Sequence, residues 1–395
     1  MAGEWRTVRF GDIAQTLPGK YIPASDYDPA GPYLIFGSNS VMGRSRVPLY
    51  DGPIIAFARI GSNCGATIFS RGACWINNNA AGIRGKDGCD TRFLFYWMQA
   101  FDFAQIREGS GQPYISDRVL KAQLVGLPPL PEQRAIAHIL GTLDDKIELN
   151  RRMSETLEQM ARALFKAWFV DFEPVRAKMD GRWRRGESLP GMPAHLYDLF
   201  PDRLVASELG KIPEGWEVGR LGALAEIQGG KQLPTDDCQP SGMFPVYGAN
   251  GIMGYTNRAT HDGFVIAFGR VGTCGSVHWT YSGAWINNNA SSVVPKWWPE
   301  YVLQAMLEAD FEDMRTGSVQ PFIPTSSLAS LQLLRAPDKV LDAFSRIVRT
   351  IRLKQQALQH QSRTLAALRD ALLPKLIRGE IRVKDAERFL EERGL

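Results

Sequence analysis

The chain has 395 residues, of which 44% are hydrophobic and 22% charged, with a net charge of +4 at pH 7. This is ordinary globular composition with material for two or three domains, and the small positive charge permits a polyanionic partner. No apolar run reaches membrane-spanning length, and the N-terminal MAGEWRTVRF lacks a signal-peptide core. We therefore expect a cytoplasmic chain with no membrane partner.

The cysteines argue against a disulfide framework and against a zinc site. They are odd in number, scattered, and form no CxxC pair: Cys64, Cys74, Cys89, Cys238 and Cys274. Such spacing is typical of a reduced intracellular protein with no metal centre.

Residues 1–130 are predicted to form a mixed α/β (α+β) domain. PIIAFARIG (53–61) and CGATIFS (64–70) are short apolar runs bounded by Gly, Asp and Ser, which is typical of strands. TRFLFYWMQAFDFAQIR (91–107) has the length and spacing of a helix.

A long helix is predicted over 131–171, with apolar residues at alternating spacings of three and four. This pattern over about five heptads favours a coiled-coil seam, which needs a partner helix. The seam positions are Ile136, Leu140, Leu143, Ile147, Asn150, Ser154, Leu157, Ala161, Leu164 and Trp168.

Residues 172–215 are rich in Pro, Gly and Arg, and we expect an extended linker there. Its basic residues around Trp183 either contact phosphate or belong to a mobile loop: Arg176, Lys178, Arg182, Arg184 and Arg185.

The sequence then repeats itself. IFGSNSVMG (35–43) matches VYGANGIMG (246–254) at an offset of 211 residues, and WINNNA occurs at both 75–80 and 285–290. GSGQPYI (109–115) recurs as GSVQPFI (317–323). Because so long a shared string does not arise by chance, residues 216–336 are predicted to be a second copy of the first domain.

A second long helix is predicted over 337–378, ending near Pro374, followed by a tail over 379–395 with no counterpart in the first half. Its seam positions are Leu341, Phe344, Val348, Ile351, Gln355, Leu358, Ser362, Leu365 and Leu372. The order domain, helix, domain, helix predicts an antiparallel coiled coil with a domain at each end, related by a pseudo-two-fold axis. The polar seam residues, Asn150 among them, would fix its register.

The sequence carries no recognisable catalytic motif. It has no phosphate-binding G-x-x-x-x-G-K-[ST], no dinucleotide-binding G-x-G-x-x-G and no H-E-x-x-H. Asp202, Glu208 and Lys211 resemble a nuclease triad only loosely, because their spacing is wrong. We therefore predict no catalytic residues.

Both domains offer hydrogen-bonding side chains in Gly/Ser-rich turns, which suit phosphates and base edges. In the first copy these are Lys20, Asn39, Arg44, Arg46, Arg59, Asn63, Gln112 and Tyr114. In the second they are Lys231, Asn250, Tyr255, Asn257, Arg258, Arg270, Gln320 and Phe322. Each alone is better explained as an ordinary surface residue, but their recurrence in both copies favours double-stranded DNA binding.

WINNNA has two interpretations: amides that touch bases, or amides that cap turns. If the two copies read different half-sites, base-reading residues should differ between them, which favours a scaffold role for WINNNA. The divergent positions Arg44/Tyr255, Arg46/Asn257 and Asn63 are then better candidates for specificity.

With these residues in place, the whole chain resembles the specificity subunits of type I restriction–modification systems. The matching segments are LPPLPEQRAIAHIL, KAWFVDFEPVRAK, LYDLFPDRLVASELGKIPEGW and LLPKLIRGEIRV. The resemblance implies a prokaryotic, non-catalytic subunit with two target recognition domains, which reads a split asymmetric DNA site. It also implies two methyltransferase subunits that use S-adenosylmethionine, restriction subunits that use ATP and Mg²⁺, and no cofactor on this chain.

Two other hypotheses remain at this point. The chain could be an assembly scaffold whose domains bind protein, or a catalytic chain such as a nuclease. Equal affinity for all DNA sequences would favour the first, and metal-dependent cleavage by the isolated chain the second.

Overall fold

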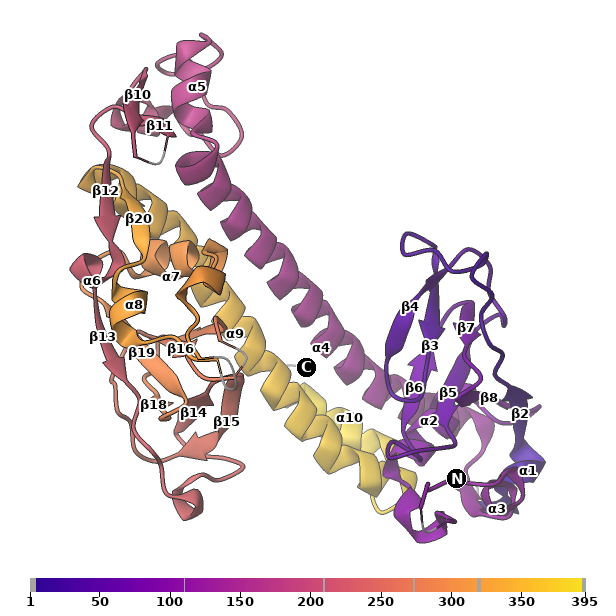
Figure 1. The fold of residues 1–395 in the computed structure, drawn as a ribbon. Coiled ribbons are helices and arrows are strands. Elements are labelled where there is room, and N and C mark those ends of the chain that lie inside the picture. The colour runs from indigo at the N-terminus through magenta and orange to yellow at the C-terminus, as the bar shows by residue number, and fades with distance from the viewer. Residues whose placement is uncertain (1–4, 110, 209, 273, 318–320, 393–395) are drawn as a thin grey trace. The chain divides into compact units, whose positions relative to one another are not determined.

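The computed structural model describes residues 5–109, 111–208, 210–272, 274–317 and 321–392. The chain divides into two compact units, whose elements are labelled in Figure 1. Unit 1 comprises Met1–Arg151 and Gln359–Leu395, and unit 2 comprises Arg152–Leu358. No described helix is long and apolar enough to cross a membrane.

Unit 1 contains the first mixed domain and parts of both long helices. Its strands are β1 (Arg6–Arg9), β2 (Ala14–Pro18), β3 (Tyr33–Phe36), β4 (Val41–Ser45), β5 (Ile54–Ala58), β6 (Thr67–Ser70), β7 (Cys74–Ile76), β8 (Ala80–Gly85) and β9 (Leu124–Leu127). Its helices are α1 (Phe10–Ile13), α2 (Thr91–Ala100), the 3₁₀ turn η1 (Phe103–Ile106), α3 (Asp117–Lys121), the start of α4 (Leu130–Phe165), the end of α9 (Asp338–Ile377) and α10 (Val383–Glu391).

Unit 2 contains the second mixed domain. Its strands are β10 (Leu204–Ser207), β11 (Gly210–Pro213), β12 (Glu217–Arg220), β13 (Ala225–Gly229), β14 (Phe244–Gly248), β15 (Gly251–Thr256), β16 (Val265–Gly269), β17 (Val277–Thr280), β18 (Trp285–Ile286), β19 (Ala290–Pro295) and β20 (Gln332–Arg335). Its shorter helices are the π-helical η2 (Lys166–Val170), α5 (Glu173–Met179), η3 (Ala194–Leu199), α6 (Leu221–Leu224), η4 (Thr235–Asp237), α7 (Pro299–Glu308), η5 (Glu312–Met314) and α8 (Thr325–Ala329).

The strand orders of the two mixed domains are the same. A four-stranded sheet has the order β2-β8-β5-β6 in unit 1 and β13-β19-β16-β17 in unit 2. A three-stranded sheet has the order β4-β3-β7 in unit 1 and β15-β14-β18 in unit 2, and β1-β9 corresponds to β12-β20. The repeat in sequence is therefore a repeat in fold.

The central strands explain why the apolar runs fold as they do. Every residue of β5 and of β16 is buried, because each strand lies inside its sheet and its two faces pack into different clusters of buried side chains. Continuous apolar runs of four to eight residues suit such positions.

The helix predicted over 91–107 is interrupted. α2 ends at Ala100, and a separate 3₁₀ turn follows. The Asp102 carboxylate accepts a hydrogen bond from the Ala104 amide, and side chains of this kind compete with continued helix.

Pro374 does not end the second long helix, contrary to the prediction from sequence. α9 continues through it to Ile377, and the Arg378 amide donates to the Pro374 carbonyl. A proline removes one helical hydrogen bond but leaves its own carbonyl available, so one further turn can form.

The long helices run antiparallel within each unit. In unit 1 the Asn150 amide donates to Gln361 Oε1 at 2.9 Å and to Ser362 Oγ at 3.3 Å. In unit 2 Gln355 Nε2 donates to the Ser154 carbonyl at 2.9 Å. Most predicted seam residues are buried: Ile136, Leu140, Leu143, Asn150, Ala161, Trp168, Leu341, Phe344, Val348, Gln355, Leu358, Leu365 and Leu372. The others are half-buried: Ile147, Ser154, Leu157, Leu164, Ile351 and Ser362.

Residues 172–208 and 210–215 are folded rather than extended, contrary to the prediction from composition. Trp183 is 1% exposed, and its indole N–H donates to the Glu187 carbonyl at 2.9 Å. Leu196, Phe200 and Ile212 join it in the core of unit 2. These widely spaced apolar side chains anchor the segment. They form no periodic pattern among the many Pro, Gly and Arg residues, so the composition alone predicts an extended linker.

The C-terminal residues also fold. Ala386 of α10 is buried in the core of unit 1, and the half-buried Ile381, Val383 and Leu390 pack against the same core. This segment has no counterpart in the sequence repeat, but it completes the first core.

Candidate nucleic-acid interface

Four turns of the first mixed domain are joined in two pairs by backbone hydrogen bonds, and the two pairs meet where β5 ends beside the start of β8, at Ala58 and Ala80. The Asn77 amide, between β7 and β8, donates to the Phe36 carbonyl at the end of β3. The Gly61 amide, after β5, donates to the Pro113 carbonyl, and the Ile115 amide donates to the Arg59 carbonyl. We call the turns 37–40, 59–66, 77–79 and 107–116 loop cluster 1, of which residue 110 lies outside the described structure.

Unit 2 builds the same arrangement. The Asn287 amide donates to the Tyr247 carbonyl, the Gly272 amide donates to the Pro321 carbonyl, and the Ile323 amide donates to the Arg270 carbonyl. The turns 248–251, 270–276, 287–289 and 315–323 form loop cluster 2, of which residues 273 and 318–320 lie outside the described structure.

The WINNNA strings support these clusters. The indole N–H of Trp75 donates to the Lys20 carbonyl, and that of Trp285 donates to the Lys231 carbonyl, both at 2.9 Å. Asn77 is 6% exposed, and its side-chain oxygen accepts from the next amide at 2.6 Å, as in unit 2. These contacts agree with the scaffold interpretation for the tryptophan and the first asparagine. The other two asparagines of each string are exposed.

The predicted first-copy residues fall into two groups. Asn39, Arg59, Asn63, Gln112 and Tyr114 belong to loop cluster 1, and Lys20 lies beside it through its bond to the Ile76 carbonyl. Arg44 and Arg46 lie toward the opposite end of β4. There Arg44 donates to the Gly31 carbonyl at 3.0 Å, and Arg46 pairs with Asp28 at 3.2 Å. The fold therefore does not bring these two arginines to the cluster.

The second-copy residues divide in the same way. Asn250, Arg270 and Phe322 belong to loop cluster 2, with Lys231 beside it, and Gln320 lies outside the described residues. Tyr255, Asn257 and Arg258 lie at the other end of β15 or just beyond it, where Arg258 pairs with Asp237 at 2.7 Å and covers the Trp285 ring.

The charged surroundings of one arginine differ between the two loop clusters, although the arginine itself occurs in both copies as Arg59 and Arg270. Arg270 Nε donates to the Asn288 carbonyl at 3.2 Å, whereas Arg59 lies near the Asp117 carboxylate. Burial raises the pKa of Asp117, but Lys121, Thr16 and Arg59 together outweigh it and hold that pKa below its ordinary value. The repeat places Thr325 at the corresponding position of unit 2, so loop cluster 2 lacks this carboxylate.

A histidine beside loop cluster 2 is neutral at pH 7. Burial, with the charge of Lys231, lowers the pKa of His261 below its ordinary value. The repeat places Tyr50 at this position in unit 1, where its hydroxyl donates to the Pro18 carbonyl at 2.6 Å. Neither residue adds charge to its cluster at that pH.

Two exposed apolar tips were missed by the sequence interpretation. Val41 and Met42 are 48% and 52% exposed at the start of β4, and Ile252 and Met253 are 43% and 58% exposed in β15. The Asn77 side chain contacts the Met42 sulfur at 3.3 Å, which ties the tip to loop cluster 1. The repeated VMG and IMG strings carried the signal for these tips.

The described residues contain no group of three or more His, Cys, Asp or Glu side chains able to hold a metal ion. Asp202, Glu208 and Lys211 are all exposed, outside both loop clusters. What both clusters present is a hydrogen-bonding surface of amides and cations.

Comparison with known proteins agrees with this picture. A family model described as "Type I restriction modification DNA specificity domain" matches residues 2–159 and 213–358. The type I restriction enzyme MjaIX specificity subunit of Methanocaldococcus jannaschii is 24% identical, covering 89% of this chain and 79% of the relative. The HindI specificity subunit of Haemophilus influenzae is 27% identical, covering 70% of this chain and 73% of the relative.

A solved structure shares the fold. The S subunit of a type I restriction–modification system from M. genitalium aligns with a TM-score of 0.61 at 16% identity, covering 94% of this chain and 96% of that one.

Proposed function

Because the chain belongs to the type I restriction–modification DNA specificity family, we propose that its two mixed domains each read one half of a split, asymmetric DNA site. The family's specificity domain occurs twice here, and the curated relatives are specificity subunits. The role of the chain is therefore DNA recognition, without catalysis of its own.

The observation that carries the proposal is the pair of loop clusters. Their backbone bonds repeat from one unit to the other, whereas exposed side chains differ, as at Asn63, which the second copy lacks, and at Tyr114, where the second copy has Phe322. A constant scaffold with variable exposed amides and cations suits two readers of different base sequences.

The exposed apolar tips add a second kind of contact. Side chains such as Met42 and Met253 can pack against thymine methyl groups or enter the minor groove between base steps. Their presence at the same place in both copies favours a contact that both half-sites share.

We divide the chain as follows. Residues 1–130 and 216–336 are target recognition domains, 131–171 and 337–378 are spacer helices, 172–215 joins the halves, and 379–395 completes the first core. The helices form an antiparallel coiled coil that relates the domains by a pseudo-two-fold axis and sets the distance between half-sites. The antiparallel hydrogen bonds of Asn150 and Gln355 support this pairing. Deleting one heptad from each helix should then change half-site spacing and leave the half-site sequences alone.

The proposed partners are double-stranded DNA, two methyltransferase subunits docked on the spacer helices, and restriction subunits. S-adenosylmethionine, ATP and Mg²⁺ would belong to those partners. The small net charge suggests that tight, salt-dependent DNA binding needs their phosphate contacts as well.

The test is to sequence the adenines methylated by the complex assembled with its methyltransferase subunits. Asn63→Ala with Gln112→Ala should relax one half of the methylated site and leave the other intact. Asn250→Ala should affect only the other half, and Glu187→Ala, at an exposed acid of the joining segment, serves as the control. Equal methylation of all sequences by the wild-type complex would favour a protein-binding scaffold instead.

A further inference from the structure

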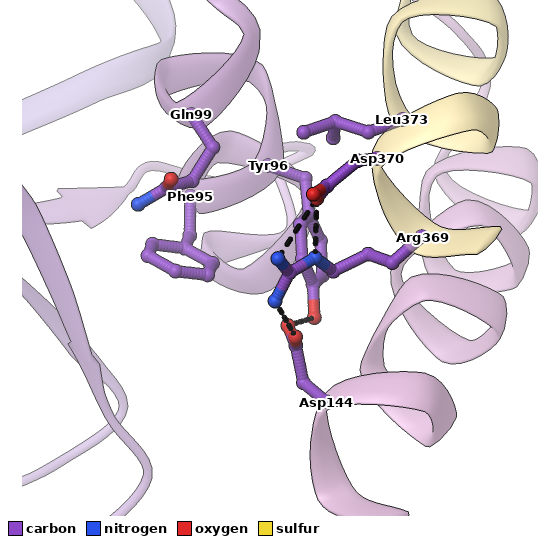
Figure 2. Close-up of a pocket in the computed structure, with 7 residues that line it drawn as sticks. All are labelled: Phe95, Tyr96, Gln99, Asp144, Arg369, Asp370 and Leu373. Carbon is purple, nitrogen blue, oxygen red and sulfur yellow. Dashed lines mark hydrogen bonds and ion pairs between the residues drawn. The ribbon is translucent and has the colours of Figure 1, made fainter. Parts of the chain in front are cut away.

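An ion pair joins both long helices to the first recognition domain. In unit 1, Arg369 of α9 donates to Asp144 of α4 at 2.7 Å, and the Tyr96 hydroxyl of α2 donates to the other oxygen of Asp144 at 2.6 Å. Figure 2 shows the three groups converging, with Asp370 beside the same guanidinium. They line a cavity of about 270 Å³. We call this contact lock 1.

Unit 2 contains a corresponding contact, lock 2. Arg352 of α9 is fully buried and pairs through both guanidinium nitrogens with Glu158 of α4. It also donates to Gln304 of α7, at 2.6 Å, and to Gln355, at 2.9 Å. The second recognition domain is thus held to both long helices, as the first is.

The internal repeat relates the two locks. The second helix follows the first at an offset of 208 residues, which relates the seam positions Ile136 and Phe344. The same offset relates Tyr96 to Gln304 and Asp144 to Arg352. The helix position that faces the recognition domain is therefore an acid on α4 and a base on α9.

This reversal has a consequence for pairing between like helices. Replacing α9 by a second copy of α4 puts Asp144 where Arg352 stands, so Glu158 meets an acid. Replacing α4 by a second copy of α9 puts Arg352 where Asp144 stands, so Arg369 meets an arginine. Like charges in a half-buried contact are repulsive, and arranging them against unwanted partners is a way to specify pairing.

We propose that the charge reversal between the locks restricts each long helix to the unlike helix, and so excludes pairing of α4 with α4 or of α9 with α9 from a second copy of this chain. The inference rests on the helix pairing of the proposed function, and it is independent of which bases are read. It assigns Asp144, Glu158, Arg352 and Arg369 the role of keeping the two halves distinct.

Three variants of the full chain test it. Exchanging one lock, as Glu158→Arg with Arg352→Glu, keeps the pair within the chain. It also makes both like-helix contacts attractive, because Asp144 then faces a base and Arg369 faces an acid. Exchanging both locks, with Asp144→Arg and Arg369→Asp added, makes the like-helix contacts repulsive again. As a matched control, Arg203→Glu with Glu214→Arg exchanges an exposed pair away from the long helices.

The readout is the mass of each protein, refolded across a range of concentrations and measured by light scattering. Wild type, the double exchange and the control should refold as single chains. The single exchange should form a two-chain species. Its dissociation constant should be at least about tenfold lower than that of wild type, as expected when repulsive contacts become attractive. Single-chain mass for the single exchange at every concentration overturns the proposal, and so does equal association of the single and double exchanges.

A separate measurement distinguishes failure of the pairing itself. Arg352→Glu alone places two acids together in lock 2 and should lower the unfolding midpoint, and adding Glu158→Arg should restore it. If neither change moves the midpoint, the helix pairing of the proposed function is wrong. If the masses follow the expected pattern but the assembled complex shows no DNA selectivity, only the proposed DNA recognition is contradicted, and the helix pairing stands.

Discussion

The two units share a fold and differ in how their recognition domain is held. In unit 2 the central group is Arg352, fully buried and bonded to Glu158, Gln304 and Gln355. In unit 1 both members of the pair, Asp144 and Arg369, keep more than a quarter of their surface exposed. The contact therefore occurs at the same repeat position in both units, but the sign of its charge and its burial differ. The free energy lost on breaking the contact should be larger in unit 2, where Arg352 is fully buried.

The largest expected effect separates the two locks. Glu158→Ala leaves the buried Arg352 without its counterion and should cost about 3–5 kcal/mol of unfolding free energy. Asp144→Ala breaks a more solvated pair and removes the acceptor of Tyr96, and should cost about 1–2 kcal/mol. Urea unfolding followed by tryptophan fluorescence measures both. Equal losses would contradict the difference in burial.

A second comparison concerns the segments that complete each core. Trp183→Ala removes a fully buried ring from the 172–215 segment and should cost about 3 kcal/mol. Leu390→Ala, in the half-buried face of α10, should cost about 1 kcal/mol. Arg184→Ala, an exposed neighbour of Trp183, is the control and should leave the unfolding midpoint unchanged.

The repeat and the long helices could be predicted from the sequence, because identical strings and heptad spacing are local signals. The residues that form lock 2 could not be predicted from the sequence. Arg352 falls outside the apolar heptad positions, and its acceptor Gln304 lies 48 residues away in another element. A charge at such a position is read as solvent-facing until the fold places an acid and an amide beside it.

The candidate site was predictable to a similar extent. Turn residues such as Asn63 and Gln112 were identified because the repeat marks both copies of their turns. Arg44 and Arg46 were selected by the same argument, yet their strand carries them away from the cluster. Sequence position in a hairpin does not say which end a side chain occupies until strand register is known.

The exposed tips provide a smaller test of the two recognition domains. Met42→Ala and Met253→Ala should each weaken binding of the assembled complex to its DNA site by about 1 kcal/mol, or roughly fivefold, through lost apolar contact. If each tip contacts its own half-site, as proposed, a DNA carrying only one correct half-site should respond to one substitution and not to the other. Fluorescence anisotropy at fixed salt concentration measures this.

The smallest effect expected is a pH dependence of lock 2. Burial raises the pKa of Glu158, but hydrogen bonds and charge from Arg352, with Gln355 and Arg162, outweigh it and hold the pKa below its ordinary 4.5. A lowered pKa in the folded chain means that the carboxylate stabilises the fold above pH 4.5 and loses this contribution as the pH falls toward the folded pKa. The unfolding midpoints of wild type and Glu158→Gln should therefore differ at pH 7 and converge below pH 4.5.

Salt distinguishes this buried contribution from a surface one. Arg203 also holds the pKa of Glu214 below its ordinary value, but that pair is exposed, so its contribution should vanish at about 1 M salt, where screening acts over about 3 Å. The difference between wild type and Glu158→Gln should survive the same salt because Arg352 is fully buried. If salt removes both differences alike, lock 2 is solvated in solution, and the asymmetry between the two units lies in charge alone.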